Sequence, residues 1–206
     1  MITILFLHGF FASGSCDMAR QLRKSFEGRY RVLTPDLPLH PEEALDKVFS
    51  ICGNEYVDLI VGNSCGSFYG QMAATAIGKP ALLGNPYFKM TDFLTPRIGP
   101  QTYKARRRDG HQNFVIDQQL IDEFDRMQKS QFDLSFQERD EVWGLFGEHD
   151  TLAHFEPLFL EHFTHSFHFP GGHTPTAEEV RLYYVPLIER MLHEYVDDFE
   201  LETEEE

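Results

Sequence analysis

The sequence predicts an α/β protein in which a mostly parallel central sheet is flanked by helices. Short apolar runs alternate along the chain with longer segments of helical character. Several runs are continuously apolar rather than alternating, as is typical of strands buried on both faces of a parallel sheet. The alternation of strand and helix implies right-handed crossovers between parallel strands.

Six apolar runs are expected to be strands, and five segments between or after them are expected to be helices. The strands are expected at residues 2–7, 30–35, 57–62, 80–84, 141–147 and 165–170. The helices are expected at residues 16–26, 42–51, 67–77, 155–163 and 176–195. The start of the last one, Thr-Pro-Thr-Ala-Glu-Glu, is typical of a helix N-terminus.

The chain is expected to form one domain over residues 1–196. From Tyr87 to Asp140 no strong strand is expected, and the composition is polar and aromatic. An interval of this length is usually a lid or a binding insertion, so residues 87–140 are expected to cover a site. Residues 197–206 carry seven acidic residues and no basic one, which predicts a flexible, solvated tail.

The charge and the cysteines exclude several classes of protein. A net charge of −15 argues against a nucleic-acid partner, because phosphate recognition needs clustered Lys and Arg. The apolar run at residues 2–7 is far shorter than the ~20 residues of a membrane span and follows no basic segment, so no membrane partner is expected. Cys16, Cys52 and Cys65 cannot all pair and lack metal-ligand spacing. We expect a reduced, cytoplasmic protein.

The stretch "LIVGNSCGSFYG" contains two possible nucleophiles, Ser64 and Cys65, at the turn between an expected strand and an expected helix. In the pattern G-x-S-x-G, Gly62 and Gly66 lack a Cβ, so strand and helix can approach each other around a sharply bent backbone. This spacing places Ser64 at the apex and favours it as the nucleophile. The N–H of Cys65 then points to where an oxyanion would form, and its thiol is expected to face away from the substrate.

A serine hydroxyl needs a base, which is usually a histidine oriented by a carboxylate and later in the chain. "EVWGLFGEHD" places Asp150 just after one expected strand, and "HSFHFPGGHTP" places His173 just after the next. Alternatives remain for both residues. Asp150 could instead cap the following helix, with Glu148 or Asp92 as the acid, and His173 could cap the last helix.

A second oxyanion donor is expected from the loop after the first strand, "FLHGFFASGS". Gly9 permits a turn there, and the backbone N–H of Phe10 is the expected donor, with that of Phe11 as the next choice. His8 is expected to support this loop by hydrogen bonding rather than to catalyse. The aromatic residues expected to line the substrate pocket are Phe11, Tyr87 and Phe88.

Two further patterns have competing interpretations. His162, His165 and His168 suggest a metal site, but their spacing spans a helix end and a strand, so convergence on one ion is not expected. The basic run at residues 106–108 could receive an anionic leaving group, such as a nucleotide-bearing thiol. The expected alternative is a solvated face paired with local acids.

These residues are where the chain resembles the α/β-hydrolases, and among them the YqiA-like small serine esterases. The resemblance rests on "LHGF", "PDLPLHPEEAL", "LIVGNSCGSFYG", "LLGNP", "GEHD" and "GGH". It implies a cytosolic serine esterase or thioesterase without a cofactor or metal. Carried onto this sequence, it implies that Ser64 is the nucleophile, Asp150 the acid and His173 the base, with Phe10 and Cys65 as backbone donors.

The functional hypothesis is therefore acyl transfer through a Ser-His-Asp triad and an acyl-enzyme intermediate. The expected partner is a small ester or thioester, and the expected state is a monomer or homodimer. Two alternatives stay open. The first is a non-catalytic ligand-binding protein of the same fold, and the second is a small peptidase that uses the same triad.

Overall fold

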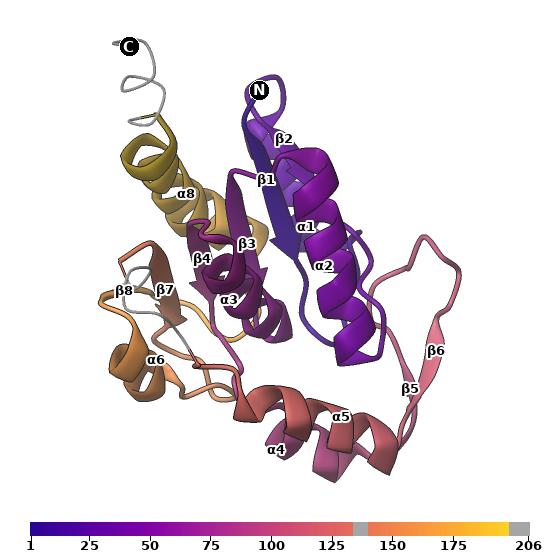
Figure 1. Cartoon of the computed structure of the whole chain (residues 1–206). Helices are drawn as coiled ribbons and strands as arrows, with labels where there is room; N and C mark the ends of the chain where they lie inside the picture. Colours follow the sequence, from indigo (N-terminus) through magenta and orange to yellow (C-terminus); the bar gives the residue numbers. More distant parts are fainter. Residues whose placement is uncertain (134–139, 198–206) are drawn as a thin grey trace.

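The computed structural model describes residues 1–133 and 140–197, and it contains a six-stranded parallel sheet (Figure 1). The strand order is β2-β1-β3-β4-β7-β8. All six expected strands are present, with ends that shift by at most two residues. They are β1 (Thr3–Leu7), β2 (Arg31–Leu33), β3 (Leu59–Asn63), β4 (Ala81–Gly84), β7 (Val142–Gly147) and β8 (His165–Phe169).

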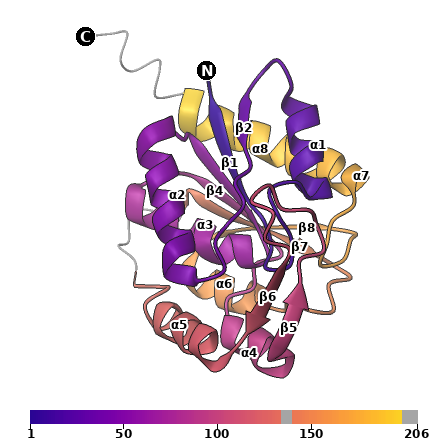
Figure 2. The ribbon, with the colours of Figure 1, turned by 90° about the vertical axis from the view of Figure 1, so that its right-hand side faces the viewer.

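The central strands are continuously apolar because helices cover both faces of the sheet (Figure 2). Every residue of β1, β3 and β4 is buried. One face packs against α1 (Asp17–Phe26) and the C-terminal helices, and the other packs against α2 (Pro41–Glu55), α3 (Cys65–Ile77) and α6 (Glu156–His162). The α/β class predicted from the sequence is confirmed.

The expected closing helix is a continuous helical run whose hydrogen bonding changes along its length. It consists of α7 (Ala177–Glu179), the π segment η3 (Val180–Tyr184), α8 (Val185–Leu192) and the π segment η4 (His193–Asp197). Thr176 and Glu179 form a reciprocal capping box at its start, as the sequence pattern indicated. Pro186 has no N–H to donate to the preceding turn, which accounts for the π register just before it.

The interval between β4 and β7 contains two strands that the sequence did not predict. Its elements are α4 (Met90–Leu94), the 3-10 turn η1 (Thr95–Arg97), β5 (Gly99–Thr102), β6 (Asn113–Ile116) and α5 (Gln118–Lys129). β5 and β6 form an antiparallel hairpin. Only the absence of a strong strand was expected here, and β5 is a weak one, because it begins with Gly-Pro and its residues alternate between half-buried and exposed, so it lacks an apolar run.

All six strands run in the same direction, so their carboxyl ends meet at one edge of the sheet. The chain passes from β1 outward to β2 and then returns to β3 on the other side of β1. Crevices for ligands form at such a reversal of strand order. Figure 1 shows α4, α5 and the β5–β6 hairpin beyond this edge.

The structure gives partial information on two further predictions, the acidic tail and the absence of a membrane span. Residues 198–206 of the expected acidic tail lie outside the described residues. Among residues 1–133 and 140–197, no helix combines the length and the apolar character needed to cross a membrane.

Candidate active site

Ser64 occupies a strained backbone conformation between β3 and α3. Its φ of 57° and ψ of −120° are rarely adopted by a residue with a side chain. A Cβ on Gly62 would lie 2.6 Å from backbone atoms of Gly66 and Ser67, and a Cβ on Gly66 would overlap the carbonyl of Leu7. Both glycines of the pattern are therefore required by the close approach of helix and strand.

The side chains of Ser64, His173 and Asp150 form a continuous hydrogen-bonded chain. His173 Nε2 lies 2.8 Å from Ser64 Oγ, and His173 Nδ1 lies 2.8 Å from Asp150 Oδ2. The Asp150 side chain is buried, and that of His173 is 17% exposed. Residues that follow β3, β7 and β8 meet here because these parallel strands end at the same edge of the sheet.

The Asp150 carboxylate is held by the backbone as well as by His173. Its Oδ1 accepts hydrogen bonds from the N–H groups of Leu152 (2.7 Å) and Ala153 (3.0 Å). Burial would raise the pKa of this carboxyl, but the hydrogen bonds from His173 and the backbone lower it below its ordinary value. An ionised carboxylate only accepts hydrogen bonds, so Nδ1 of His173 carries the proton and Nε2 is free to accept from the Ser64 hydroxyl.

The alternative acids, Glu148 and Asp92, do not hydrogen-bond to the His173 imidazole. Glu148 and Asp92 are both exposed, and the hydrogen bonds of His173 within the described part of the chain do not include them. The capping alternative for Asp150 was wrong, because α6 begins at Glu156 with Phe155 as its N-cap, and the Asp150 carboxylate instead accepts from the N–H groups of Leu152 and Ala153 in the preceding turn. The same carboxylate thus fixes a loop and orients His173.

Sequence reasoning missed Asn85, which follows β4 and is 1% exposed. Its Nδ2 donates to the carbonyls of Gly172 (2.9 Å) and His173 (3.0 Å), and its Oδ1 accepts from the N–H of Gly147 (2.7 Å). It also has a positive φ of 40°, which asparagine tolerates better than most residues. The sequence signal that could have identified Asn85 is its place in "GNP" directly after a strand, because a polar side chain at a strand end can hydrogen-bond to a neighbouring loop.

The loop after β1 lies directly against the nucleophile. A Cβ on Gly9 would be 3.4 Å from Ser64 Cβ and 3.8 Å from Ser64 Oγ. Cys65 is the first residue of α3, so its N–H has no acceptor within the helix. In the described part of the chain no protein atom accepts from the N–H of Phe10 either. Two backbone donors therefore remain available beside Ser64.

His8 supports this loop, in the position expected for it. Its Nδ1 donates to the carbonyl of Gly9 (2.8 Å), and its Nε2 accepts from the N–H of Leu37 (3.0 Å). Burial lowers the pKa of His8 from 6.5 to about 4, so the ring is neutral near pH 7. One fixed tautomer thus links the loop after β1 to the loop after β2.

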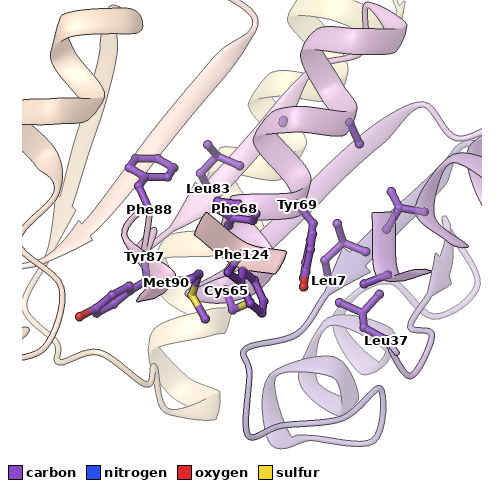
Figure 3. Packing of buried hydrophobic residues seen from close by; sticks show 14 of the residues in the cluster. Leu7, Leu37, Cys65, Phe68, Tyr69, Leu83, Tyr87, Phe88, Met90 and Phe124 are labelled. Carbon is purple, nitrogen blue, oxygen red and sulfur yellow. The ribbon is translucent and has the colours of Figure 1, made fainter. Parts of the chain in front are cut away.

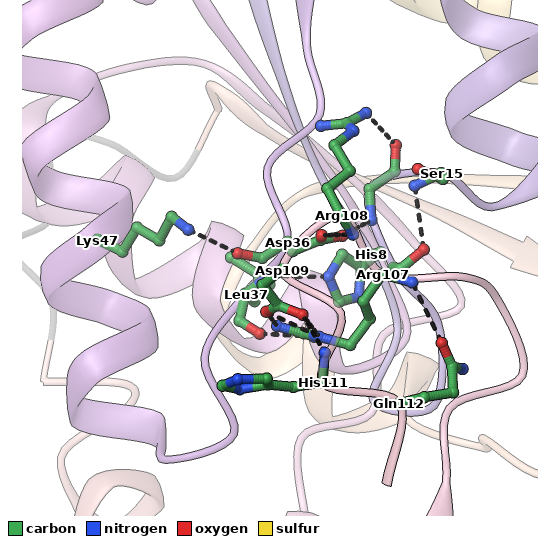
Figure 4. A network of polar contacts seen from close by, with 12 residues as sticks. His8, Ser15, Asp36, Leu37, Lys47, Arg107, Arg108, Asp109, His111 and Gln112 are labelled. Carbon is green, nitrogen blue, oxygen red and sulfur yellow. Dashed lines mark hydrogen bonds and ion pairs between the residues drawn. The ribbon is translucent and has the colours of Figure 1, made fainter.

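A polar network joins the insertion to these two loops (Figure 4). Asp36 accepts from the N–H of Gly14 (2.8 Å) and from the N–H of Arg108 (2.6 Å). The Arg107 guanidinium donates to the carbonyl of Leu37 (3.0 Å) and pairs with Asp109. For Arg107 the expected pairing with a local acid is confirmed by Asp109, but the expected solvation is wrong, because the side chain is buried and also donates to the Leu37 carbonyl.

A cavity of about 880 Å³ opens beside the nucleophile and contains Ser64 and His173 in its wall. Phe11 lines it, as expected, together with Phe93 from the insertion. Tyr87 and Phe88 do not line it, contrary to expectation. Both are buried in the core cluster shown in Figure 3. Phe88 packs against Phe132 and Phe155, and the ring of Tyr87 meets the His173 imidazole edge-on at 6.4 Å.

Cys65 contributes only its backbone to this site. Its side chain is 2% exposed and lies in the same core cluster (Figure 3). Burial raises the pKa of the thiol to about 12, and this effect outweighs the lowering by the hydrogen bond with Tyr69. The structure therefore leaves Ser64 as the accessible nucleophile of the pair.

The three histidines of residues 162–168 do not converge. His162, at the end of α6, stacks on the ring of Phe132. His165 and His168 lie in β8, where the ring of His165 contacts Trp143 and His168 forms a hydrogen bond with Glu156. Within residues 1–133 and 140–197 no group of three or more metal-ligating side chains comes together.

A comparison with protein families identifies the chain. The family described as "Uncharacterised protein family (UPF0227)" matches residues 3–175. The chain belongs to this family. The match includes β1 to β8 and all three residues of the Ser64–His173–Asp150 contact.

Solved structures with a similar fold support the α/β-hydrolase resemblance of this UPF0227 member. Three examples are the monoacylglycerol lipase of Paleococcus ferrophilus, Est1E of Butyrivibrio proteoclasticus and the esterase domain of a Rhodothermus marinus protein. Their TM-scores are 0.68, 0.66 and 0.67, with 14%, 13% and 15% sequence identity. The matches cover 93%, 93% and 95% of this chain and 94%, 88% and 88% of those chains, respectively. At this identity they establish the fold.

Proposed function

We propose that this protein is a serine hydrolase that cleaves the carboxylic ester or thioester bond of small acyl substrates. The observation that carries the proposal is the chain of two 2.8 Å contacts from Ser64 through His173 to Asp150, at the wall of the 880 Å³ cavity. A hydroxyl, a base and an orienting carboxylate in this order are the components of nucleophilic acyl transfer.

In the first half of the reaction, His173 Nε2 takes the proton of Ser64 Oγ while the oxygen attacks the carbonyl carbon. The carbonyl oxygen becomes an oxyanion, which accepts hydrogen bonds from the N–H groups of Phe10 and Cys65. As the tetrahedral intermediate collapses, His173 gives its proton to the departing alcohol or thiol, and the acyl group stays on Ser64. One such oxyanion donor contributes about 3–4 kcal/mol to the barrier reduction.

In the second half, a water molecule replaces the leaving group. His173 takes a proton from the water as it attacks the acyl-enzyme, and returns that proton to Ser64 Oγ when the acid departs. Throughout, the Asp150 carboxylate keeps the Nδ1 proton in place and stabilises the imidazolium. The insertion supplies one wall of the cavity through Phe93 and so acts as the element that selects substrates.

A fluorophosphonate probe tests the nucleophile. We expect wild-type protein and the control Ser50→Ala, which changes an exposed serine on α2, to be labelled equally. Ser64→Ala should not be labelled. Absence of labelling in the wild type, or undiminished labelling of Ser64→Ala, would contradict the proposal and favour a non-catalytic ligand-binding protein.

A substrate panel separates the esterase from the small peptidase. Acyl esters of graded chain length are compared with aminoacyl amides of similar size. We expect hydrolysis of the esters, because an activated serine needs no further machinery to expel a phenol or thiol. Faster hydrolysis of the amides, relative to their uncatalysed rates, would assign the site to peptides instead.

A further inference from the structure

The charged residues that line the catalytic cavity have the opposite sign to the protein as a whole. The chain has 33 acidic and 18 basic residues. The cavity wall, however, contains one carboxylate, Asp17, and the four cations Arg20, Arg97, Lys104 and Arg106. Asp17 pairs with Arg20, so these two charges compensate each other. Three positive charges remain around an active site in an acidic protein.

These three cations come from one segment and have no ionic partner in the described part of the chain. Arg97, Lys104 and Arg106 all belong to the insertion, within or beside the β5–β6 hairpin. The ion pairs among the described residues include none of them. Their neighbours in the basic run differ, since Arg107 pairs with Asp109 and the Arg108 guanidinium donates to the carbonyls of Thr34 and Gly14.

The contacts of the three residues hold them in place without neutralising them. The Arg97 guanidinium lies 4.2 Å from the ring centroid of Phe93 and donates to the Phe93 carbonyl. The Lys104 ammonium lies 5.8 Å from the ring centroid of Phe11, and its backbone N–H donates to the Phe11 carbonyl at 2.8 Å. The carbonyl of Arg106 accepts from Ser13 Oγ at 2.9 Å. Aromatic rings orient a cation and leave its charge available to a ligand.

We propose that the cations Arg97, Lys104 and Arg106 form a subsite for an anionic group, so that the preferred substrate is an ester or thioester that carries a carboxylate or phosphate. This inference rests on the proposed function and deepens it. The apolar part of the substrate lies on Phe11 and Phe93, and the anion meets the positive rim of the same cavity. Like charges elsewhere on the protein repel such a ligand, so the rim also directs it to the site.

Matched pairs of synthetic esters test the subsite. One arm compares the para-nitrophenyl monoester of glutaric acid with its methyl ester, which places the charge on the acyl side. Two further arms place a carboxylate or a phosphate on the phenol of an aryl butyrate, the carboxylate against its methyl ester and the phosphate against its uncharged dimethyl ester. The spontaneous hydrolysis rate of each ester is measured without enzyme and subtracted before kcat/KM is calculated.

We expect at least one anionic ester to have a kcat/KM about tenfold above that of its neutral partner, because three weak exposed ion pairs act together. The arm that shows the preference tells whether the anion lies on the acyl side or the phenol side of the substrate, and whether a carboxylate or a phosphate is preferred. The triple variant Arg97→Gln, Lys104→Gln, Arg106→Gln should lose the preference, measured as the ratio of kcat/KM for the anionic ester to kcat/KM for its neutral partner. The control Lys24→Gln removes an exposed cation outside the cavity and should retain the preference.

Raising the salt concentration should also reduce the preference, by about threefold or more between ~0.02 M and ~0.5 M NaCl, because ions screen exposed charges. Binding provides a readout without catalysis. Benzoate and phenyl phosphate are titrated calorimetrically into Ser64→Ala, with and without the triple substitution, which should weaken the tighter ligand about tenfold.

Equal kcat/KM values within every pair, with unchanged binding in the triple variant, would overturn the subsite. The two proposals fail in different ways. If the fluorophosphonate probe does not label Ser64, the hydrolase function fails, and the binding comparison still decides whether the anion subsite exists. If Ser64 is labelled and neutral esters are hydrolysed without any anionic preference, only the subsite fails.

Discussion

The side-chain amide of Asn85 donates a hydrogen bond to the backbone carbonyl of His173 at 3.0 Å. The same nitrogen donates to the carbonyl of Gly172, and Oδ1 accepts from the N–H of Gly147. Asn85 thereby joins the ends of β4 and β7 to the loop that carries His173. We expect the contact between His173 and Ser64 to depend on Asn85, although its hydrogen bonds reach neither of their reacting atoms.

Replacing Asn85 tests this positioning role. Asn85→Gly keeps the positive φ accessible and removes all three hydrogen bonds. We expect kcat for an activated ester to fall by about tenfold or more with little change in KM, because His173 is no longer held at its distance from Ser64. Unpaired buried groups should also lower the free energy of unfolding by about 1–3 kcal/mol, measured with urea.

The isosteric variant Asn85→Asp separates loss of volume from loss of the donor. It keeps the size of the side chain but presents a carboxylate oxygen to the two carbonyls, so it should lose activity as Asn85→Gly does. Wild-type kcat in both variants would show that the loop holds His173 without this amide.

Two glycines of α3 provide a matched pair for the packing at the nucleophile turn. In Gly66→Ala the new Cβ overlaps the carbonyl of Leu7 in the central strand β1, so we expect a loss of more than about 3 kcal/mol or no folded protein. In Gly70→Ala the Cβ lies 3.4 Å from side-chain methyls of Ile60 and Leu83. This variant should stay within about 1 kcal/mol of the wild type in urea unfolding. Equal stabilities would contradict the close approach at Gly66.

The buried imidazole of His8 makes stability depend on pH. Its pKa is about 4 in the folded protein and 6.5 in the reference state. Below pH 6.5 the unfolded chain binds a proton that the folded protein does not, so stability present above pH 6.5 is lost as the pH falls towards 4. The shift corresponds to about 3 kcal/mol.

Urea unfolding of wild type and His8→Gln across this pH range measures the effect. Glutamine can donate to the Gly9 carbonyl and accept from the N–H of Leu37, but it does not titrate. Between pH 6.5 and 4 the free energy of unfolding of His8→Gln should therefore fall by about 3 kcal/mol less than that of the wild type. The Asp150 carboxyl, whose pKa is lowered, contributes stability that is lost at still lower pH, and it does so in both proteins. Parallel curves would show that His8 binds a proton as readily in the folded as in the unfolded state.

The thiol of Cys65 should be inert in the native protein. Its pKa of about 12 leaves almost no thiolate at neutral pH, and the side chain is buried. We expect Ellman's reagent to modify it at least about a hundredfold more slowly in the native than in the unfolded protein. Cys65→Ala should leave the native reaction trace unchanged and keep ester hydrolysis within about threefold. Loss of hydrolysis in Cys65→Ala, with activity retained in Ser64→Ala, would reverse the assignment of the nucleophile.

Much of the fold and part of the site could be predicted from sequence because the causes are local. A continuously apolar run identifies a strand buried on both faces, as in β1, β3 and β4, and all six expected strands were found close to their expected ends. The hairpin of β5 and β6 escaped prediction because its stability comes from pairing across a long loop and not from an apolar run. Tyr87 and Phe88 were misplaced because their position after β4 does not reveal which way their rings turn.

The sequence by itself determined part of the turn around Ser64, since Gly62 is required by the backbone of the nearby Gly66 and Ser67, whereas Gly66 is required by the carbonyl of Leu7 in β1. Only the tertiary structure decided what surrounds each functional group. Strand order brought Asp150 and His173 to Ser64, and burial in the core raised the pKa of the Cys65 thiol. The same holds for the basic run, where distant loops bind Arg107 and leave Arg106 at the cavity. Burial and charge pairing depend on residues far apart in the chain, so no local pattern specifies them.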